Sequence, residues 1–177
     1  MAWMWILLAV VLVLLLLLVG AGIFFFRFSM VRGGKDPKET DFLREGTIWY
    51  PFLQRMEEAQ AWIRSHTAEH VRLRSYDGLT LSALYLPAQG ESKGVVVAFP
   101  GYRPLATVDF ALEAELFHRL GYELLLPYQR SHGESQGKYI TYGVRERFDC
   151  RDWARYAAKR FGQEKPLFLA GISMGAA

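Results

Sequence analysis

The sequence predicts an α/β domain that follows a single membrane-spanning helix, and three observations lead to that fold class. Residues 1–26 are apolar and carry no charged side chain. Two stretches of alternating polar and apolar residues flank Asp77-Gly78, as in a β-hairpin. After residue 94, short apolar runs alternate with segments of helical periodicity, which predicts parallel strands joined by crossover helices.

The apolar N-terminal run is long enough for a membrane-spanning helix, which needs roughly 20 residues. A cleaved signal peptide is the main alternative, but its apolar core is about 7–15 residues and follows a basic start. Here no Lys or Arg precedes the run, and bulky Phe24-Phe25-Phe26 follow Gly20-Ala21-Gly22. A buried core helix is a poorer third alternative because no polar face interrupts the run. We therefore expect residues 3–26 to lie in a lipid bilayer as an uncleaved anchor.

Basic residues after the anchor bear on its orientation. Only the α-amino group precedes the apolar run, whereas four basic side chains follow it: Arg27, Arg32, Lys35 and Lys38. Positive charge favours the cytoplasmic side of a membrane, so we expect the rest of the chain in the cytoplasm.

Residues 27–68 are expected to connect the anchor to the domain. Their first part, residues 27–41, is polar and contains Gly33-Gly34, which indicates a linker. Pro51 to Ser65 predicts an amphipathic helix, which either packs on the domain or lies near the bilayer. Its apolar residues stand at helical spacing: Phe52, Met56, Ala59 and Ile63.

The domain itself is expected over residues 69–177. The hairpin strands lie on either side of Asp77-Gly78, and three later apolar runs predict short buried strands, the first of them buried on both faces. Those runs are Val95–Phe99, Glu123–Leu126 and Pro166–Gly171. Helices are expected at Thr107–Leu120, with Thr107 as its cap and Gly121 at its end, and at Val144–Phe161, which ends at Gly162.

Charge and cysteine content argue against several function classes. The net charge is +3, and the basic residues are scattered without a stripe of interleaved aromatics, so nucleic-acid binding has little support. The one cysteine, Cys150, has no partner for a disulfide, and no Cys/His cluster indicates zinc. We expect it to be a small buried apolar residue, and no metal or organic cofactor is implied.

The last predicted strand runs into Gly171-Ile172-Ser173-Met174-Gly175, which has the G-x-S-x-G pattern of a nucleophile elbow. Ser173 would sit on a sharp strand-to-helix turn, in a sparsely populated backbone conformation. Gly171 and Gly175 would flank it because a Cβ would clash where strand and helix approach closely. The alternative is a glycine-rich turn without chemistry.

Several motifs occur in an order that resembles the α/β-hydrolases. They are the Asp77-Gly78 hairpin, Pro100-Gly101-Tyr102, residues 130–135 and the elbow. The closest pattern is the serine aminopeptidase and monoacylglycerol-lipase-like group, which includes membrane-anchored bacterial forms. The resemblance covers about residues 69–177.

The resemblance implies a role for each matching residue. Ser173 matches the nucleophile, and the backbone N–H groups of Met174 and Tyr102 match the two oxyanion-hole donors. The family often has His-Gly where this chain has Pro100-Gly101, but Tyr102 keeps its own N–H. His132 matches a loop histidine that shapes the surroundings of the site and is not the base. Asp149, on a predicted helix, is expected to cap, pair or face water.

The catalytic base poses a separate question. In this fold the order along the chain is Ser, then Asp or Glu, then His. Only Met174 to Ala177 follow Ser173, so we expect residues 1–177 to be the first part of such a hydrolase, lacking the triad Asp and His and nearly inactive alone. The sheet order of the family that the chain resembles also implies that the last strand lies beside the third, with an open apolar edge that favours aggregation.

These observations predict a membrane-anchored serine hydrolase that cleaves esters, thioesters or amides through an acyl-enzyme on Ser173. Its expected partners are the lipid bilayer and a small acyl, ester or peptide substrate. The alternative is a non-catalytic, membrane-anchored binding or scaffold protein with the same fold, because fold does not fix function.

Overall fold

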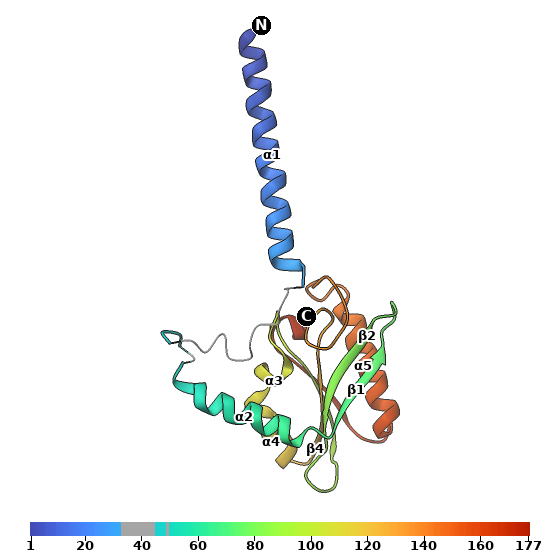
Figure 1. Cartoon of the computed structure of the whole chain (residues 1–177). Coiled ribbons are helices and arrows are strands. Elements are labelled where there is room, and N and C mark those ends of the chain that lie inside the picture. The colour runs from blue at the N-terminus through green and yellow to red at the C-terminus, as the bar shows by residue number, and fades with distance from the viewer. Residues whose placement is uncertain (33–44, 49) are drawn as a thin grey trace.

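The computed structural model describes residues 1–32, 45–48 and 50–177. A long helix, α1 (Ala2–Met30), stands apart from a compact α/β domain (Figure 1). Within the described residues, α1 is the one helix long and apolar enough to cross a membrane, a test that a signal sequence also passes. The helix continues beyond its expected end at Phe26, because no proline or glycine interrupts it there and the long side chain of Arg27 can extend away from an apolar surface.

The domain contains one mixed sheet of five strands in the order β1-β2-β4-β3-β5. The strands are β1 (Glu69–Arg74), β2 (Thr80–Leu86), β3 (Gly94–Phe99), β4 (Tyr122–Pro127) and β5 (Leu167–Gly171). β2 pairs antiparallel with β1 and β4, whereas β3 pairs parallel with β4 and β5. The predicted hairpin, the parallel strands and the place of the last strand beside the third are confirmed.

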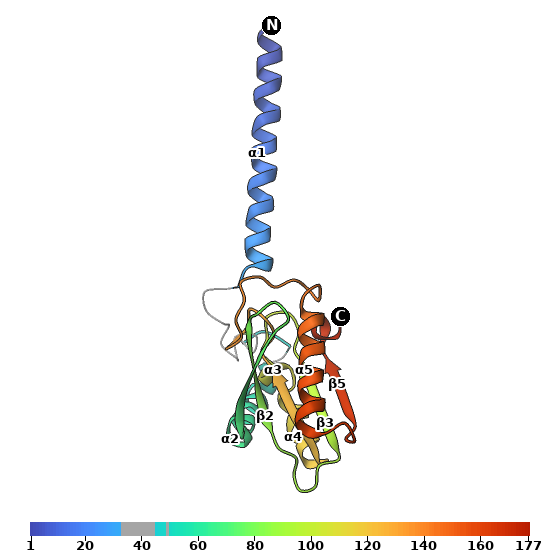
Figure 2. The same cartoon turned by 90° about the vertical axis from the view of Figure 1, so that its right-hand side faces the viewer.

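Helices cover both faces of the sheet (Figures 1 and 2). α2 (Leu53–His66), α3 (Ala106–Asp109) and α4 (Ala111–Arg119) lie on one face, and α5 (Glu146–Phe161) lies on the other. Successive side chains of β4 lie on opposite faces of the sheet, and the core has one cluster of buried residues on each face. Leu124 and Leu126 pack in the first cluster, and Leu125 packs in the second.

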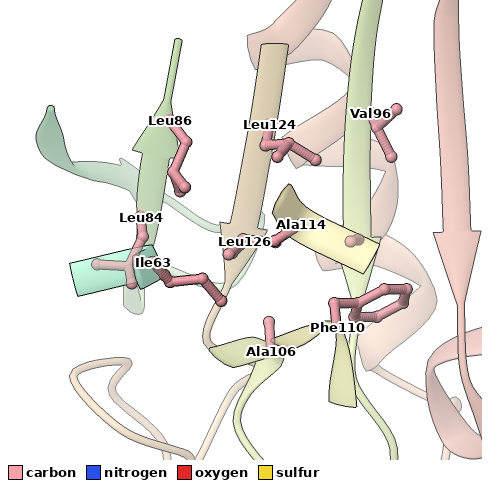
Figure 3. Close-up of a cluster of buried hydrophobic side chains, with 10 residues drawn as sticks. Ile63, Leu84, Leu86, Val96, Ala106, Phe110, Ala114, Leu124 and Leu126 are labelled. Atoms are coloured by element: carbon pink, nitrogen blue, oxygen red, sulfur yellow. The ribbon is translucent and has the colours of Figure 1, made fainter. Parts of the chain in front are cut away.

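The first cluster joins α2, α3 and α4 to the sheet. Figure 3 shows Ile63, Phe110 and Ala114 beside leucines of β2 and β4. The second cluster contains Trp153 of α5, which is 1% exposed, and Cys150 is partly buried against it. The core therefore fixes the carboxyl ends of β3, β4 and β5 at the end of the domain that faces α1.

The amphipathic helix packs on the domain. A 3₁₀ turn, Tyr50–Phe52, contains Pro51, and α2 follows it and lies against α4. Ala59 and Ile63 are buried as expected, but Phe52 is 49% exposed.

The expected helix at Thr107–Leu120 is divided into α3 and α4. Phe110 interrupts it with φ −112° and ψ 20°, and the N-cap residue is Leu105, not Thr107. The Asp109 carboxylate accepts a hydrogen bond from the N–H of Gly101, and Phe110 is buried in the core. These two tertiary contacts set the first turn apart from the rest of the helix.

One further boundary and the burial of one strand differ from the sequence-based expectation. α5 begins at Glu146 instead of Val144, because the Glu146 carboxylate accepts the N–H groups of Thr141 and Gly143. β5 is not buried on both faces: Phe168 and Leu169 are 48% and 54% exposed. Among the described residues β5 pairs with β3 alone, so its outer edge is open and apolar as expected.

The start of the predicted linker, residues 27–41, is also ordered differently. Residues up to Met30 belong to α1, Val31 forms a bridge with Tyr139, and the N–H of Arg32 donates to the carbonyl of Lys138. These first residues are attached to the domain, and the rest of that stretch, residues 33–41, lies outside the described residues.

Candidate active site

Ser173 occupies the turn between β5 and a short 3₁₀ helix, Ser173–Ala176. Its φ is 52°, in the left-handed region that residues other than glycine rarely adopt. The N–H of Ile172 donates to the carbonyl of Phe99 at 3.1 Å, and the N–H of Gly175 donates to the carbonyl of Ile172 at 2.8 Å. The expected backbone conformation at the elbow is therefore present.

The glycines on either side of Ser173 lie where no side chain fits. A Cβ on Gly171 would stand 2.8 Å from the Cα of Ala176, and still closer to the carbonyl of Gly175. A Cβ on Gly175 would stand 2.6 Å from the carbonyl oxygen of Pro100. The first clash is the strand-to-helix contact that we expected, whereas the second is with the end of β3.

The turn after β3 lies beside the serine. A Cβ on Gly101 would stand 3.5 Å from the Cβ of Ser173. The N–H of Gly101 donates to Asp109 at 2.6 Å, and the N–H of Arg103 donates to His132 at 3.1 Å. Between them, the N–H of Tyr102 has no acceptor among the residues that the structure describes.

The N–H of Met174 likewise donates to no described residue. The expected oxyanion donors, Met174 and Tyr102, therefore come from two turns that meet at Ser173. An anion placed there could accept hydrogen bonds from both N–H groups, which have no acceptor among the described residues.

Asp109 is a positioning residue that the sequence did not single out. It lies in α3, and its carboxylate fixes the N–H of Gly101 at the start of the candidate oxyanion turn. Burial raises the pKa of Asp109, and the hydrogen bond from Gly101 opposes that shift. The sequence offered only one sign of this role, an acidic residue shortly after the turn, and acidic residues are also common in the first turn of any helix.

His132 is 4% exposed and connects two loops. Its Nε2 accepts the N–H of Arg103 at 3.1 Å, so its Nδ1–H is the donor to the carbonyl of Arg130 at 2.8 Å. Both ring nitrogens are used in this way, which supports a role in shaping the site and leaves none for a proton-accepting base.

A buried ion network lies next to this loop. The Arg130 guanidinium donates to both Asp149 oxygens at 2.7 Å and also reaches Asp77 of the hairpin turn at 2.9 Å. Burial raises the pKa of Asp149, and the hydrogen bonds from Arg130 oppose it. Burial also acts on Asp77, but hydrogen bonds from Arg130 and Ser75 outweigh it and lower its pKa. Asp149 therefore pairs, which was one of its three expected roles.

Two hollows adjoin the elbow. One of about 100 Å³ lies beside Met174 and Gly175 and extends toward Trp153. The other, of about 370 Å³, has Ile172 in its wall, and its remaining lining is mainly apolar: Met56, Pro104, Val108 and Leu112, with the acids Asp109 and Glu113. Within the described residues no group of three side chains is arranged to bind a metal ion.

Comparison of the sequence with protein-family models finds no match, and comparison with curated proteins finds none either. Solved structures do match. An esterase from Pyrococcus furiosus is 25% identical, with a TM-score of 0.57 over 63% of this chain and 45% of that chain. An α/β serine hydrolase homologue from Coxiella burnetii is 24% identical, with a TM-score of 0.52 over 62% of this chain and 54% of that one.

The chain thus spans about half the length of these structures or less. An α/β hydrolase from a Penicillium species adds a third likeness at 23% identity, with a TM-score of 0.53 over 59% of this chain and 37% of that one. What the chain shares with these structures is the fold, a mixed α/β sheet with helices. From these matches and from its strand-elbow-helix geometry, the chain has the α/β-hydrolase fold.

Proposed function

We propose that Ser173 is the nucleophile of a membrane-anchored serine hydrolase that cleaves carboxylic esters, thioesters or amides. The observation that carries this proposal is the positive φ of Ser173 at the end of β5. Strain of this kind costs about 1–3 kcal/mol and persists at functional turns where the surrounding structure fixes it. A glycine at this position would avoid the strain, so a strained serine here indicates that its side chain has a function.

In the proposed reaction, the Ser173 hydroxyl oxygen attacks the carbonyl carbon of the substrate and gives its proton to a histidine. That histidine and its carboxylate partner would follow the nucleophile along the chain, as the order of this fold requires. The negative oxygen of the tetrahedral intermediate would accept hydrogen bonds from the N–H groups of Met174 and Tyr102, each contributing roughly 3–4 kcal/mol. Collapse would release the alcohol, thiol or amine and leave an acyl group on Ser173, which water then removes.

Two features favour an acyl substrate. The hollow beside Ile172 is mainly apolar and lies next to the nucleophile, so it suits the hydrocarbon part of an acyl group. The Pyrococcus furiosus protein is an esterase, and the first 26 residues of this chain supply a helix that suits a bilayer. An ester with an apolar acyl group is therefore the substrate to try first.

The test uses the protein in membranes of the cells that make it. Wild type and Ser173→Ala are compared for hydrolysis of a p-nitrophenyl ester, with Ser131→Ala as a matched control at another serine of positive φ. We expect Ser173→Ala to lose hydrolysis by several orders of magnitude and the control to retain it. Equal rates for Ser173→Ala and wild type would refute the assignment and favour a binding or scaffold role.

A further inference from the structure

The C-terminal turn of α1 is capped by residues around the candidate site. Carbonyl groups in the last turn of a helix have no partner within the helix. Here the carbonyl of Ser29 accepts the hydroxyl of Tyr102 at 2.7 Å, and that of Met30 accepts the N–H of Ile140 at 2.7 Å. The Arg103 guanidinium donates to the carbonyl of Phe28. The two residues that follow Gly101 thus touch both the site and the helix.

The residues after α1 strengthen the attachment. The Arg32 guanidinium donates to the carbonyls of Gly133 and Ser135 at 2.6 and 2.8 Å, in addition to the main-chain pairing at Val31. The helix is therefore joined to the loop between β4 and α5 by several directed contacts. These contacts fix the C-terminal end of α1 to the domain, while the rest of the helix projects away from it (Figures 1 and 2).

The length of α1 then fixes the depth of these contacts. Its 29 residues extend about 43 Å, whereas the hydrocarbon core of a bilayer is about 30 Å thick. The first charged side chain of the chain is Arg27. With the apolar part of α1 in the hydrocarbon, the last turn lies in the headgroup layer. Tyr102 and Ile140, which contact that turn, must lie close to the same layer.

Next to that turn, Tyr139 forms a bridge with Val31, and the Tyr142 hydroxyl donates to the carbonyl of Ser29 at 3.3 Å. The surface that contains these two tyrosines has the composition of a membrane interface. We call it the rim, and it consists of six exposed residues: Lys138, Tyr139, Tyr142, Val144, Arg145 and Arg147. Tyrosine is enriched at the membrane–water interface, and basic side chains attract anionic headgroups. The acid within this stretch, Glu146, is buried with its carboxylate bonded to Thr141 and Gly143, so the exposed charges of residues 138–147 are all positive.

We propose that the rim binds the anionic headgroup layer of the bilayer that holds α1. This inference rests on the anchoring part of the proposed function and is independent of the chemistry at Ser173. Binding by the rim places the turn at Gly101 and Tyr102 against the lipid surface. The Ser173 site then opens at the level of the headgroups instead of toward the aqueous phase.

Depth measurements on the full chain test this inference. In a Cys150→Ala background, a single cysteine carrying an environment-sensitive fluorophore is placed at Val144 in the rim or at Gln89. Gln89 lies in the connection between β2 and β3, at the end of the domain opposite α1 (Figure 1). The protein is inserted into vesicles of phosphatidylcholine and phosphatidylserine that contain a lipid with a shallow nitroxide quencher. We expect several-fold stronger quenching at Val144 than at Gln89.

Charge reversal supplies a matched pair of variants. Lys138→Glu, Arg145→Glu and Arg147→Glu together should reduce quenching at Val144 several-fold in these vesicles. The control reverses three exposed basic residues elsewhere, Arg119, Arg155 and Lys159, and should leave the quenching unchanged. Circular dichroism before reconstitution shows whether each variant is folded.

The outcomes separate the two proposals. Equal, weak quenching at both positions, with α1 resistant to carbonate extraction, overturns the rim inference while the anchor stands. Extraction of the whole chain by carbonate overturns the anchor and the rim together. Neither result affects the test of Ser173 by ester hydrolysis.

Discussion

Two of the turns in this domain, the hairpin turn and the elbow, place a residue in the left-handed region in opposite ways. In the hairpin between β1 and β2, the left-handed residue is Gly78, with φ 85°. At the elbow it is Ser173, with φ 52°, and neither Gly171 nor Gly175 has a positive φ. In the hairpin, glycine removes strain, whereas at the elbow the glycines provide space and the strain stays on the serine. The difference separates a turn that connects strands from a turn that presents a side chain.

The two turns also differ in what holds them. The hairpin turn is stabilised by its own side chains, since the Ser75 hydroxyl donates to Asp77 at 2.7 Å and accepts the N–H of Leu79 at 2.9 Å. Its distant hydrogen bonds come from side chains: Arg130 donates to Asp77 at 2.9 Å, and Asp152 accepts the N–H of Tyr76 at 2.9 Å. The elbow depends on main-chain contact with the end of β3. Substitutions in each turn should therefore have different costs.

The largest effect is expected where the hairpin turn meets the buried network. Arg130→Met would leave the Asp149 carboxylate buried without its partner, since the two side chains are 2% and 6% exposed. Removal of one member of a buried pair costs about 3–5 kcal/mol. Urea unfolding should show this loss, and Arg155→Met, at an exposed position of α5, should not. A loss no larger than that of the control would mean that the network does not stabilise the fold.

Gly175→Ala should be the next most costly change. Its Cβ would overlap the carbonyls of Phe99 and Pro100, and overpacking of this kind costs about 1–3 kcal/mol. Gly78→Ala is the matched comparison, because its Cβ has room and only the left-handed backbone, at roughly 1 kcal/mol, is penalised. If chemical denaturation gave the same loss in the free energy of unfolding for both variants, the steric role of Gly175 could not be distinguished from the conformational role of Gly78, and the comparison would be wrong.

Ser173→Gly should have a smaller effect of opposite sign. Release of the left-handed strain is expected to stabilise the domain by up to about 1 kcal/mol while any hydrolysis is lost. Ser173→Ala retains a Cβ and should leave the free energy of unfolding nearly unchanged. Thermal unfolding of the three proteins compares them directly, and a glycine variant no more stable than the alanine variant would contradict a strained elbow.

The smallest expected effect is on pH dependence. Burial acts to raise the pKa of Glu146, but hydrogen bonds from Thr141 and Gly143 outweigh it, so its folded pKa lies below 4.5. The stabilisation is present above pH 4.5 and is lost as the pH falls through the folded pKa. Glu146→Gln should therefore be less stable than wild type at pH 7 and should lose less stability between pH 5 and pH 3. If the variant lost as much stability as wild type between pH 5 and pH 3, that loss would come from other carboxylates.

The sequence alone located the elements whose signals are local. Alternation around Asp77-Gly78, continuous apolar runs and the elbow pattern predicted all five strands and the position of Ser173. These signals succeed because period and turn chemistry act over a few residues. The order of the strands came from the resemblance to a known family and not from the residues themselves.

The rest depends on contacts between distant residues. The break at Phe110 and the role of Asp109 follow from the turn at Gly101, which no helical periodicity encodes. The glycines of residues 33–34 suggested a linker, but Arg32 is bonded to a loop about one hundred residues later in the chain. Such contacts arise only when the sheet brings these segments together.

The central claim is that the strained Ser173 is a reactive nucleophile, and covalent labelling tests it most directly. Membranes from the host that makes the full-length protein are treated with a fluorophosphonate probe, and the labelled peptide is identified by mass spectrometry. We expect rapid labelling on Ser173, abolished by prior denaturation and absent in Ser173→Ala. No labelling of the folded protein, or labelling that persists in Ser173→Ala, would contradict it.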